Sequence, residues 1–185
     1  MIFKERWGLM KIIDLTMQIY SGMDVYPGDP EVKIECVHTY EKDSWELRQI
    51  HMGSHTGTHV DAYSHMHKGQ ATLDDIPLER FFGKALVVDQ LENSPRESGL
   101  FFIEEIGMEQ FEQIRALQPR FVGGNLTEEV ERALLGQEII TYTGLVNLEL
   151  LPKGKPFTFY GLPLKIKSGD GSPVRAIAIM DDENT

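Results

Sequence analysis

Cysteine, basic residues and long apolar runs are scarce in this sequence, and each scarcity excludes a class of protein. The single cysteine, Cys36, cannot form an internal disulfide, which suits a reducing cytoplasm. Lysine and arginine number 18 against 29 aspartates and glutamates, and the net charge of −11 argues against nucleic-acid and membrane partners. No run approaches the ~18 apolar residues of a membrane span, and the N-terminus lacks a signal-peptide core.

The remaining composition is that of a globular protein. Apolar residues make up 41% of the 185 positions and charged residues 25%, and the length suits one domain. We expect residues 1–10 to be an N-terminal extension, residues 11–180 a single domain, and residues 181–185 a disordered tail. We expect the protein to be cytoplasmic.

Alternating and clustered apolar residues predict a mixed α/β fold with strands dominating its first half. We expect strands within 11–19, 31–52, 85–89, 120–124, 139–142, 157–160, 162–166 and 174–180, the fourth ending in a Gly-Gly turn. Helical patterns cover 72–82, 103–118 and 127–135. Proline and glycine mark turns at 26–30 and 169–173. Cys36 alternates with Val32 and Ile34, so we interpret it as a small buried hydrophobic residue and not as a nucleophile.

Histidine is concentrated in one short segment. Five of the six histidines lie within residues 51–67, and Asp61 lies among them. Imidazole and carboxylate are ordinary ligands of a divalent metal. The alternative is a surface run of histidines, or histidines packed in a core. The regular interleaving with glycine, threonine and aspartate favours a metal site. The five are His51, His55, His59, His65 and His67.

The spacing of the cluster requires a bend. In a straight strand the Cα atoms of His55 and His59 would be ~13 Å apart at about 3.3 Å per residue, which is the limit of what one metal could bridge. Gly57 lies between them and tolerates positive φ. We therefore predict a bend at Gly57 or one helical turn.

Three protein ligands, His55, His59 and Asp61, would leave an open position, as in catalytic metal sites. A metal lowers the pKa of bound water towards 7 and polarises a carbonyl, which suits hydrolysis of an amide or ester. His65 is the candidate general acid/base, with His67 and His51 as alternatives. His51 could instead orient a ligand, and His67 could be exposed. The sequence has no Gly-x-Ser-x-Gly and no His-Glu-x-x-His motif.

The cluster resembles the signature His-x-Gly-Thr-His-x-Asp-x-Pro-x-His of the cyclase family of metal-dependent hydrolases, which includes bacterial kynurenine formamidases. Residues 55–65 match every fixed position except the proline, which is Tyr63 here. Further similarity lies at 14–16, 25–30, 162–165 and 169–176, and it spans most of residues 11–180.

The resemblance implies a swivelling β/β/α domain with a mixed sheet and flanking helices, zinc or manganese, and a homodimer or homotetramer. It implies His55, His59 and Asp61 as metal ligands, His65 as general acid/base, and Tyr26 as an aromatic that lines the substrate pocket. Binuclear members carry a further His and Glu twelve residues apart. Those places fall here at Glu131 and Thr143. Glu131 could ligate through oxygen or be an ordinary helical glutamate, and threonine is a poor ligand, so we expect at most one well-held metal.

These observations predict a metal-dependent hydrolase of a small amide, lactam or ester, with metal-activated water as the nucleophile and a small-molecule substrate. One alternative is a non-catalytic member that binds metal or ligand and has lost the second metal site. Another is a structural oligomer with a vestigial site.

Overall fold

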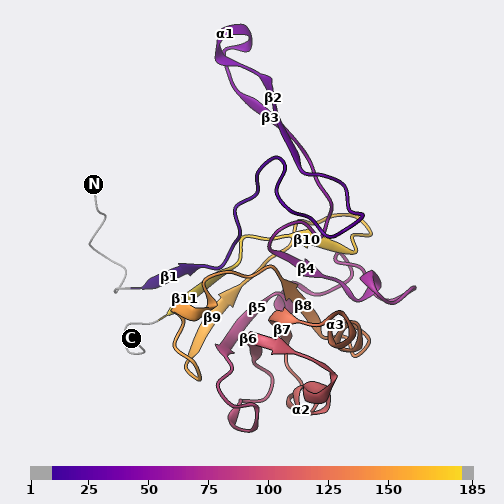
Figure 1. Cartoon of the computed structure of the whole chain (residues 1–185), viewed down its shortest axis with the longest axis vertical. Helices are drawn as coiled ribbons and strands as arrows, with labels where there is room; N and C mark the ends of the chain where they lie inside the picture. Colours follow the sequence, from indigo (N-terminus) through magenta and orange to yellow (C-terminus); the bar gives the residue numbers. More distant parts are fainter. Residues whose placement is uncertain (1–9, 181–185) are drawn as a thin grey trace.

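Within residues 10–180, which the computed structural model describes, nine strands form one mixed sheet. Their order is β1-β11-β9-β5-β6-β7-β8-β4-β10 (Figure 1). The strands from β5 to β8 are parallel, and the remaining pairings are antiparallel. The mixed α/β fold predicted from the sequence is confirmed. The strands are β1 (Lys11–Asp14), β4 (His59–Asp61), β5 (Phe82–Val87), β6 (Gly99–Ile106), β7 (Phe121–Leu126), β8 (Ile140–Thr143), β9 (Pro156–Tyr160), β10 (Gly171–Pro173) and β11 (Ile177–Met180).

Alternation along the central strands divides the core between the two faces of the sheet. Leu100 and Phe102 of β6 pack in a cluster with residues of α2 (Phe111–Leu117) and α3 (Glu128–Leu135). Phe101, between them in sequence, belongs to the other cluster, where its ring centroid lies 4.8 Å from that of Phe159. Successive side chains of a strand point to opposite faces, so one strand contributes to both layers.

A two-stranded hairpin projects from the body of the protein (Figure 1). It consists of β2 (Lys33–His38), the short helix α1 (Tyr40–Asp43) and β3 (Leu47–His51), and we call residues 33–51 the arm. The predicted pairing of strands in this region is confirmed. Cys36 is exposed, so the expectation that it is buried was wrong. Val32, just before the arm, is buried and Ile34 is partly buried, but Cys36 lies farther along the arm, which stands away from the sheet (Figure 1).

The helix predicted over residues 103–118 is wrong in its first part. Strand β6 continues through Ile106, and the α-helix covers only Phe111–Leu117. Strand β6 pairs with β5 only through Gly99–Phe101, but its pairing with β7 extends to Ile106, which lies opposite Leu126. Pairing with β7 thus continues the strand over the first residues of the expected helix, despite the helical spacing of the apolar residues.

Two expected strands are shorter than predicted, and a third is absent. The first ends at Asp14, not at residue 19, and the last begins at Ile177, not at residue 174. Residues 162–166 form no strand. Proline lacks an amide hydrogen, which disfavours continuous pairing at Pro163.

Two turns that were predicted from glycines are strand residues in the structure. Gly123 and Gly124 lie inside β7 and do not form a turn, and a Cβ at Gly124 would lie 2.0 Å from the carbonyl oxygen of Phe102. Residues 169–173 were predicted as a turn, but the segment Gly171–Pro173 is strand β10.

The helix expected over residues 72–82 is absent from the structure. The segment instead contains one 3₁₀ turn, Leu78–Arg80, which follows Pro77, and β5 begins at Phe82.

The helix expected over residues 127–135 is confirmed. Helix α3 begins after Thr127, whose side chain accepts a hydrogen bond from the Val130 amide, and it ends at Leu135. The turn at residues 26–30 is also present, with the Asp29 amide donating to the Tyr26 carbonyl at 2.9 Å. The expected extension before residue 10 and the expected tail lie outside the described residues, except for Met10 itself. In the part of the chain that the structure describes, no helix has the length and apolarity needed to cross a membrane.

Two glycines hold the loop before β4 against the end of β8. Gly57 has φ +64° and Gly144 has φ +68°. A Cβ at Gly144 would lie 2.4 Å from the Gly57 carbonyl oxygen. Gly154 has a similar φ of +71°, but a Cβ there would meet its nearest atom at 3.8 Å.

We predict that Gly144→Ala destabilises the protein more than Gly154→Ala does. Both variants place alanine in the left-handed region, at a cost of roughly 1–2 kcal/mol. Gly144→Ala also forces two backbone segments apart, which adds ~1–3 kcal/mol. Urea unfolding of both variants measures the difference, and equal costs would contradict this account of the loop.

Candidate metal centre

Three of the predicted ligands converge. His55 lies in the loop before β4, and His59 and Asp61 are the first and last residues of β4. One ligand atom of each lies within 4.8 Å of the others. The chain bends at Gly57, as the spacing predicted, and this glycine has a φ of +64°, in the left-handed region that glycine tolerates.

Asp61 is the centre of this group. Its side chain is 1% exposed, and its Oδ1 atom lies 2.6 Å from His55 Nδ1 and 3.5 Å from His59 Nε2. Burial alone would raise the pKa of Asp61, but the hydrogen bond from His55 and the charge of His59 lower it. Burial opposes charge on His55, and Asp61 together with Asp170 outweighs that effect and raises the His55 pKa to about 9. The site is built to place positive charge beside a buried carboxylate.

The histidine orientations suit a divalent metal. The Nδ1–H of His59 donates to the Gly57 carbonyl at 2.8 Å, which leaves Nε2 available towards Asp61. Thr58, between these residues, accepts a hydrogen bond from the Met17 amide and donates to the Gly144 carbonyl, so the start of β4 is fixed. Two imidazoles and one buried carboxylate form an ordinary donor set for a divalent metal, and the residues fit such an ion.

A second carboxyl group lies behind Asp61. The Thr141 hydroxyl lies 3.1 Å from Asp61 Oδ2 and 3.0 Å from Glu131 Oε1, and the Thr143 hydroxyl lies 3.2 Å from the same Glu131 oxygen. Burial, and after it the negative charge of Asp61, raises the pKa of Glu131. Glu131 is therefore a hydrogen-bonded member of the site and not an exposed helical residue.

His65 lies beside His55, as its spacing predicted. It ends the 3₁₀ turn Tyr63–His65, and its ring centroid is 3.8 Å from that of His55. Burial and the charge of His55 lower the pKa of His65, which favours its neutral form.

Sequence reasoning missed Asp170 and Thr141. Asp170 Oδ2 lies 3.0 Å from His55 Nε2 and 3.7 Å from His65 Nδ1. His55, His65 and Asp170 form a second group whose ligand atoms lie within 4.8 Å of one another. The available signal for Asp170 was its position between two glycines, which allow close approach of the backbone. Thr141 gave no signal, because its role depends on its register with β4.

The other candidate residues lie apart from this group or on its edge. Tyr26 is 69% exposed in the loop after β1, and His51 is exposed on the arm. His67 is half-buried, and its Nε2–H donates to the Arg132 carbonyl at 2.7 Å.

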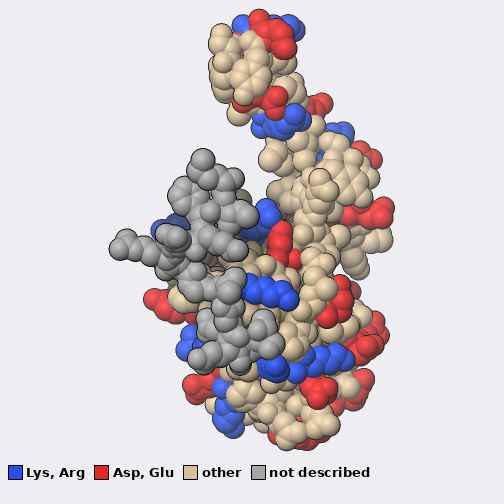
Figure 2. Space-filling view, turned by 90° about the vertical axis from the view of Figure 1, so that its left-hand side faces the viewer, with Lys and Arg blue, Asp and Glu red and all other residues tan. Residues whose placement is uncertain are grey.

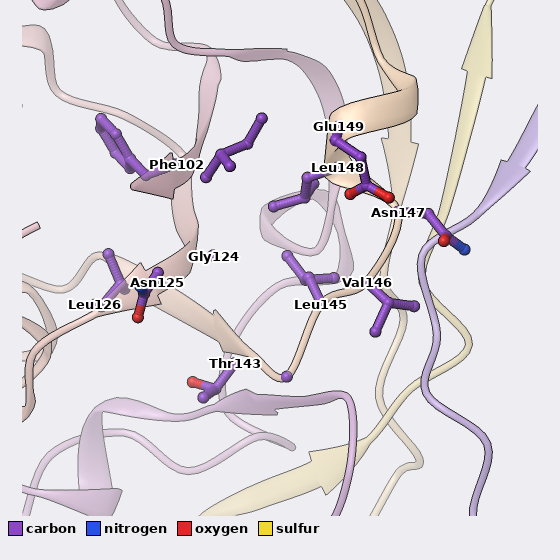
Figure 3. Close-up of a pocket in the computed structure, with 12 residues that line it drawn as sticks. Phe102, Gly124, Asn125, Leu126, Thr143, Leu145, Val146, Asn147, Leu148 and Glu149 are labelled. Atoms are coloured by element: carbon purple, nitrogen blue, oxygen red, sulfur yellow. The ribbon is translucent and has the colours of Figure 1, made fainter. Parts of the chain in front are cut away.

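A hollow of ≈ 400 Å³ opens where the parallel strands end (Figure 3). Its apolar walls are formed by Phe102, Leu126, Leu145 and Leu148. Thr143, whose hydroxyl lies 3.2 Å from Glu131 Oε1, also lines the hollow. Crevices at the carboxyl ends of parallel strands are frequent ligand sites.

Known proteins are similar to this chain in both sequence and fold. Residues 13–121 match the model of a family described as "Putative cyclase". The chain is 33% identical to the kynurenine formamidase of Salinibacter ruber over 207 residues, covering 91% of this chain and 97% of that one. A solved structure titled as a potential metal-dependent hydrolase with cyclase activity is 25% identical, with a TM-score of 0.75 over 94% and 99% of the two chains. Isatin hydrolase A from Labrenzia aggregata, solved with benzyl benzoate, has the same fold at 22% identity, with a TM-score of 0.76 over 92% and 94%.

The fold and the cluster of two histidines and a buried carboxylate define a metal-dependent hydrolase. The chain belongs to the cyclase family. The family and the fold predicted from residues 55–65 are therefore confirmed.

We predict that Thr141→Val destabilises the protein, because it leaves a buried Asp61 oxygen without its hydrogen bond. The expected loss in free energy of unfolding is about 1–3 kcal/mol, measured by urea titration of metal-free protein. Thr143→Val is the matched control, since Thr143 contacts Glu131 and not Asp61. If the Thr143 variant lost more stability than the Thr141 variant, the importance assigned to the Asp61 bond would be wrong.

Proposed function

We propose that this protein hydrolyses the C–N bond of a small amide or lactam, in the manner of an arylformamidase, with esters as further candidate substrates. The convergence of His55 and His59 on the buried Asp61 carboxylate carries this proposal. Kynurenine formamidase and isatin hydrolase, the named activities of two similar proteins, support the choice of a C–N bond outside a peptide.

We propose that His55, His59 and Asp61 hold one zinc or manganese ion. When bound, such an ion lowers the pKa of a water molecule and polarises a carbonyl oxygen. Glu131 is the candidate for a weaker second ligand set, since its carboxyl group lies next to Thr141 and Thr143. Threonine hydroxyls are poor ligands, which favours one firmly held ion.

His65 is the proposed general acid/base. In the hydrolysis, water supplies a hydroxyl to the carbonyl carbon, the C–N bond breaks, and the leaving nitrogen gains a proton. His65 takes the proton from the water and gives it to that nitrogen. Its ring lies against His55, and its depressed pKa keeps it able to accept a proton at neutral pH. Tyr26 is the proposed aromatic contact of the substrate, carried on the loop after β1.

Substitution of two histidines separates binding from chemistry. His59→Ala is expected to lose both the bound metal and turnover, because a ligand is removed. His65→Ala is expected to keep the metal and lose ~10²–10⁴-fold in kcat, the usual contribution of a general acid/base. Elemental analysis gives metal per chain, and hydrolysis of aryl formamides, lactams and esters gives turnover.

His67→Ala is the matched control, because its imidazole bonds to the Arg132 carbonyl and not to the metal group. Full turnover by His59→Ala would contradict the mechanism. Metal-loaded wild-type protein that hydrolyses none of these compounds would instead support a non-catalytic member that binds metal or ligand.

We also propose that the chain forms a homodimer through the arm, or a homotetramer made of two such dimers. An isolated two-stranded hairpin is marginally stable in water, and this one carries exposed apolar side chains. Trp45 is 48% exposed, Leu47 42% and Ile50 56%. Figure 2 shows the arm as a separate lobe whose surface is largely uncharged between small groups of both signs. A second copy would cover these side chains and support the hairpin.

We propose that the protein is located in the cytoplasm, because its single cysteine suits a reducing compartment.

A charged residue on the arm tests this assembly. Ile50→Glu is expected to shift the mass in solution towards the monomer, since it would bury a carboxylate in the proposed interface. Leu150→Glu is the control, because Leu150 is also 56% exposed but lies on the body. Light scattering after size exclusion measures the mass. A wild-type protein that is already monomeric would contradict the proposal.

A further inference from the structure

Asp170 reaches the site through strand pairing. It directly precedes β10, which pairs with β4 so that Gly171 lies opposite Asp61. The Asp170 carbonyl accepts a hydrogen bond from the Ala62 amide at 2.8 Å. A Cβ at Gly171 would lie 2.3 Å from His55 Cε1, so the backbone here fits closely against the imidazole. The position of Asp170 relative to His55 is therefore fixed by the fold.

The Asp170 carboxylate has three polar neighbours. Its Oδ2 atom lies 3.0 Å from His55 Nε2 and 3.7 Å from His65 Nδ1. Its Oδ1 atom accepts a hydrogen bond from the Ser54 hydroxyl at 3.0 Å. The side chain is 51% exposed, whereas that of Asp61 is 1% exposed. His55 thus lies between a buried carboxylate on its Nδ1 side and a half-exposed carboxylate on its Nε2 side.

We propose that Asp170 is a positioning residue, which accepts the Nε2–H of His55 and thereby presents the Nδ1 atom of that ring to the metal. The inference rests on the proposed function, since it assumes that His55 is a ligand. Ligating histidines commonly donate their second N–H to a carboxylate or carbonyl, which fixes the tautomer and the ring orientation. His59 uses the Gly57 carbonyl for this purpose and presents the opposite nitrogen, Nε2.

The alternative is that Asp170 itself is a ligand, together with His55 and His65. That arrangement would take His55 Nε2 and leave the buried Asp61 without a metal. Asp61 is the carboxylate that water cannot reach, so its charge requires a cation more than that of Asp170 does. The Ser54 hydrogen bond and the approach to His65 instead suit a group that orients its neighbours.

The test uses metal-free protein and measures affinity by chelator competition with zinc and with manganese. Asp170→Asn is expected to weaken binding by about 10- to 100-fold, with the number of ions per chain unchanged at saturation. Asp74→Asn is the matched control and should bind as wild type, because Asp74 supports the same segment through the Ser168 amide at 2.9 Å without touching a histidine. Ser54→Ala should give a smaller loss, since it removes only the anchor of Asp170, and it serves if Asp170→Asn does not fold.

Nitrogen-15 spectra of the imidazole rings give a second readout that does not depend on activity. The proposal expects His55 to bind metal through Nδ1 and His59 through Nε2. Binding of His55 through Nε2 would overturn the inference, and so would wild-type affinity in both Asp170→Asn and Ser54→Ala. Wild-type protein that binds neither metal would overturn the proposed function as well, so the two failures are distinguishable.

Discussion

The charge of one buried carboxylate, Asp61, is the constraint on which the site depends. A carboxylate that is 1% exposed is stable only when neighbouring groups replace the water that it has lost. Two imidazoles face one of its oxygens, and a threonine hydroxyl faces the other. The chain bends at Gly57, between His55 and His59 in the sequence. A metal ion in the same place would supply the positive charge that the surrounding residues are arranged to provide.

Strand register positions these groups. Strand β4 lies between β8 and β10, and Asp61 is opposite Thr141 on one side and Gly171 on the other. A slip of one residue in either pairing would turn the wrong face of the neighbouring strand towards Asp61. The site therefore combines residues that are up to 115 positions apart, such as His55 and Asp170. The arm ends at His51, just before the loop that carries His55. An interface at the arm would therefore be close in sequence to the metal ligands.

The sequence predicted the parts of the site that are local in the chain. The spacing of His55 and His59 around Gly57 was enough to predict a bend that brings metal ligands together. Outside the site, the Thr127 cap marked the start of α3. Contributions from distant segments were not predictable in this way. Thr141 and Asp170 matter only because β8 and β10 pair with β4, and strand β6 continues to Ile106 through its pairing with Leu126 of β7. Cys36 follows a pattern typical of burial, yet it lies on an arm that has no core beneath it.

The central claim is that this group of residues holds one metal ion on which hydrolysis depends. Its most direct test is elemental analysis of wild-type protein purified without a metal-affinity tag and dialysed against zinc or manganese, combined with turnover of an aryl formamide before and after chelation. The account predicts about one ion per chain, with activity lost on chelation and restored when the metal is returned. Protein that retains no metal, or that hydrolyses its substrate equally well after complete removal of the metal, would contradict it.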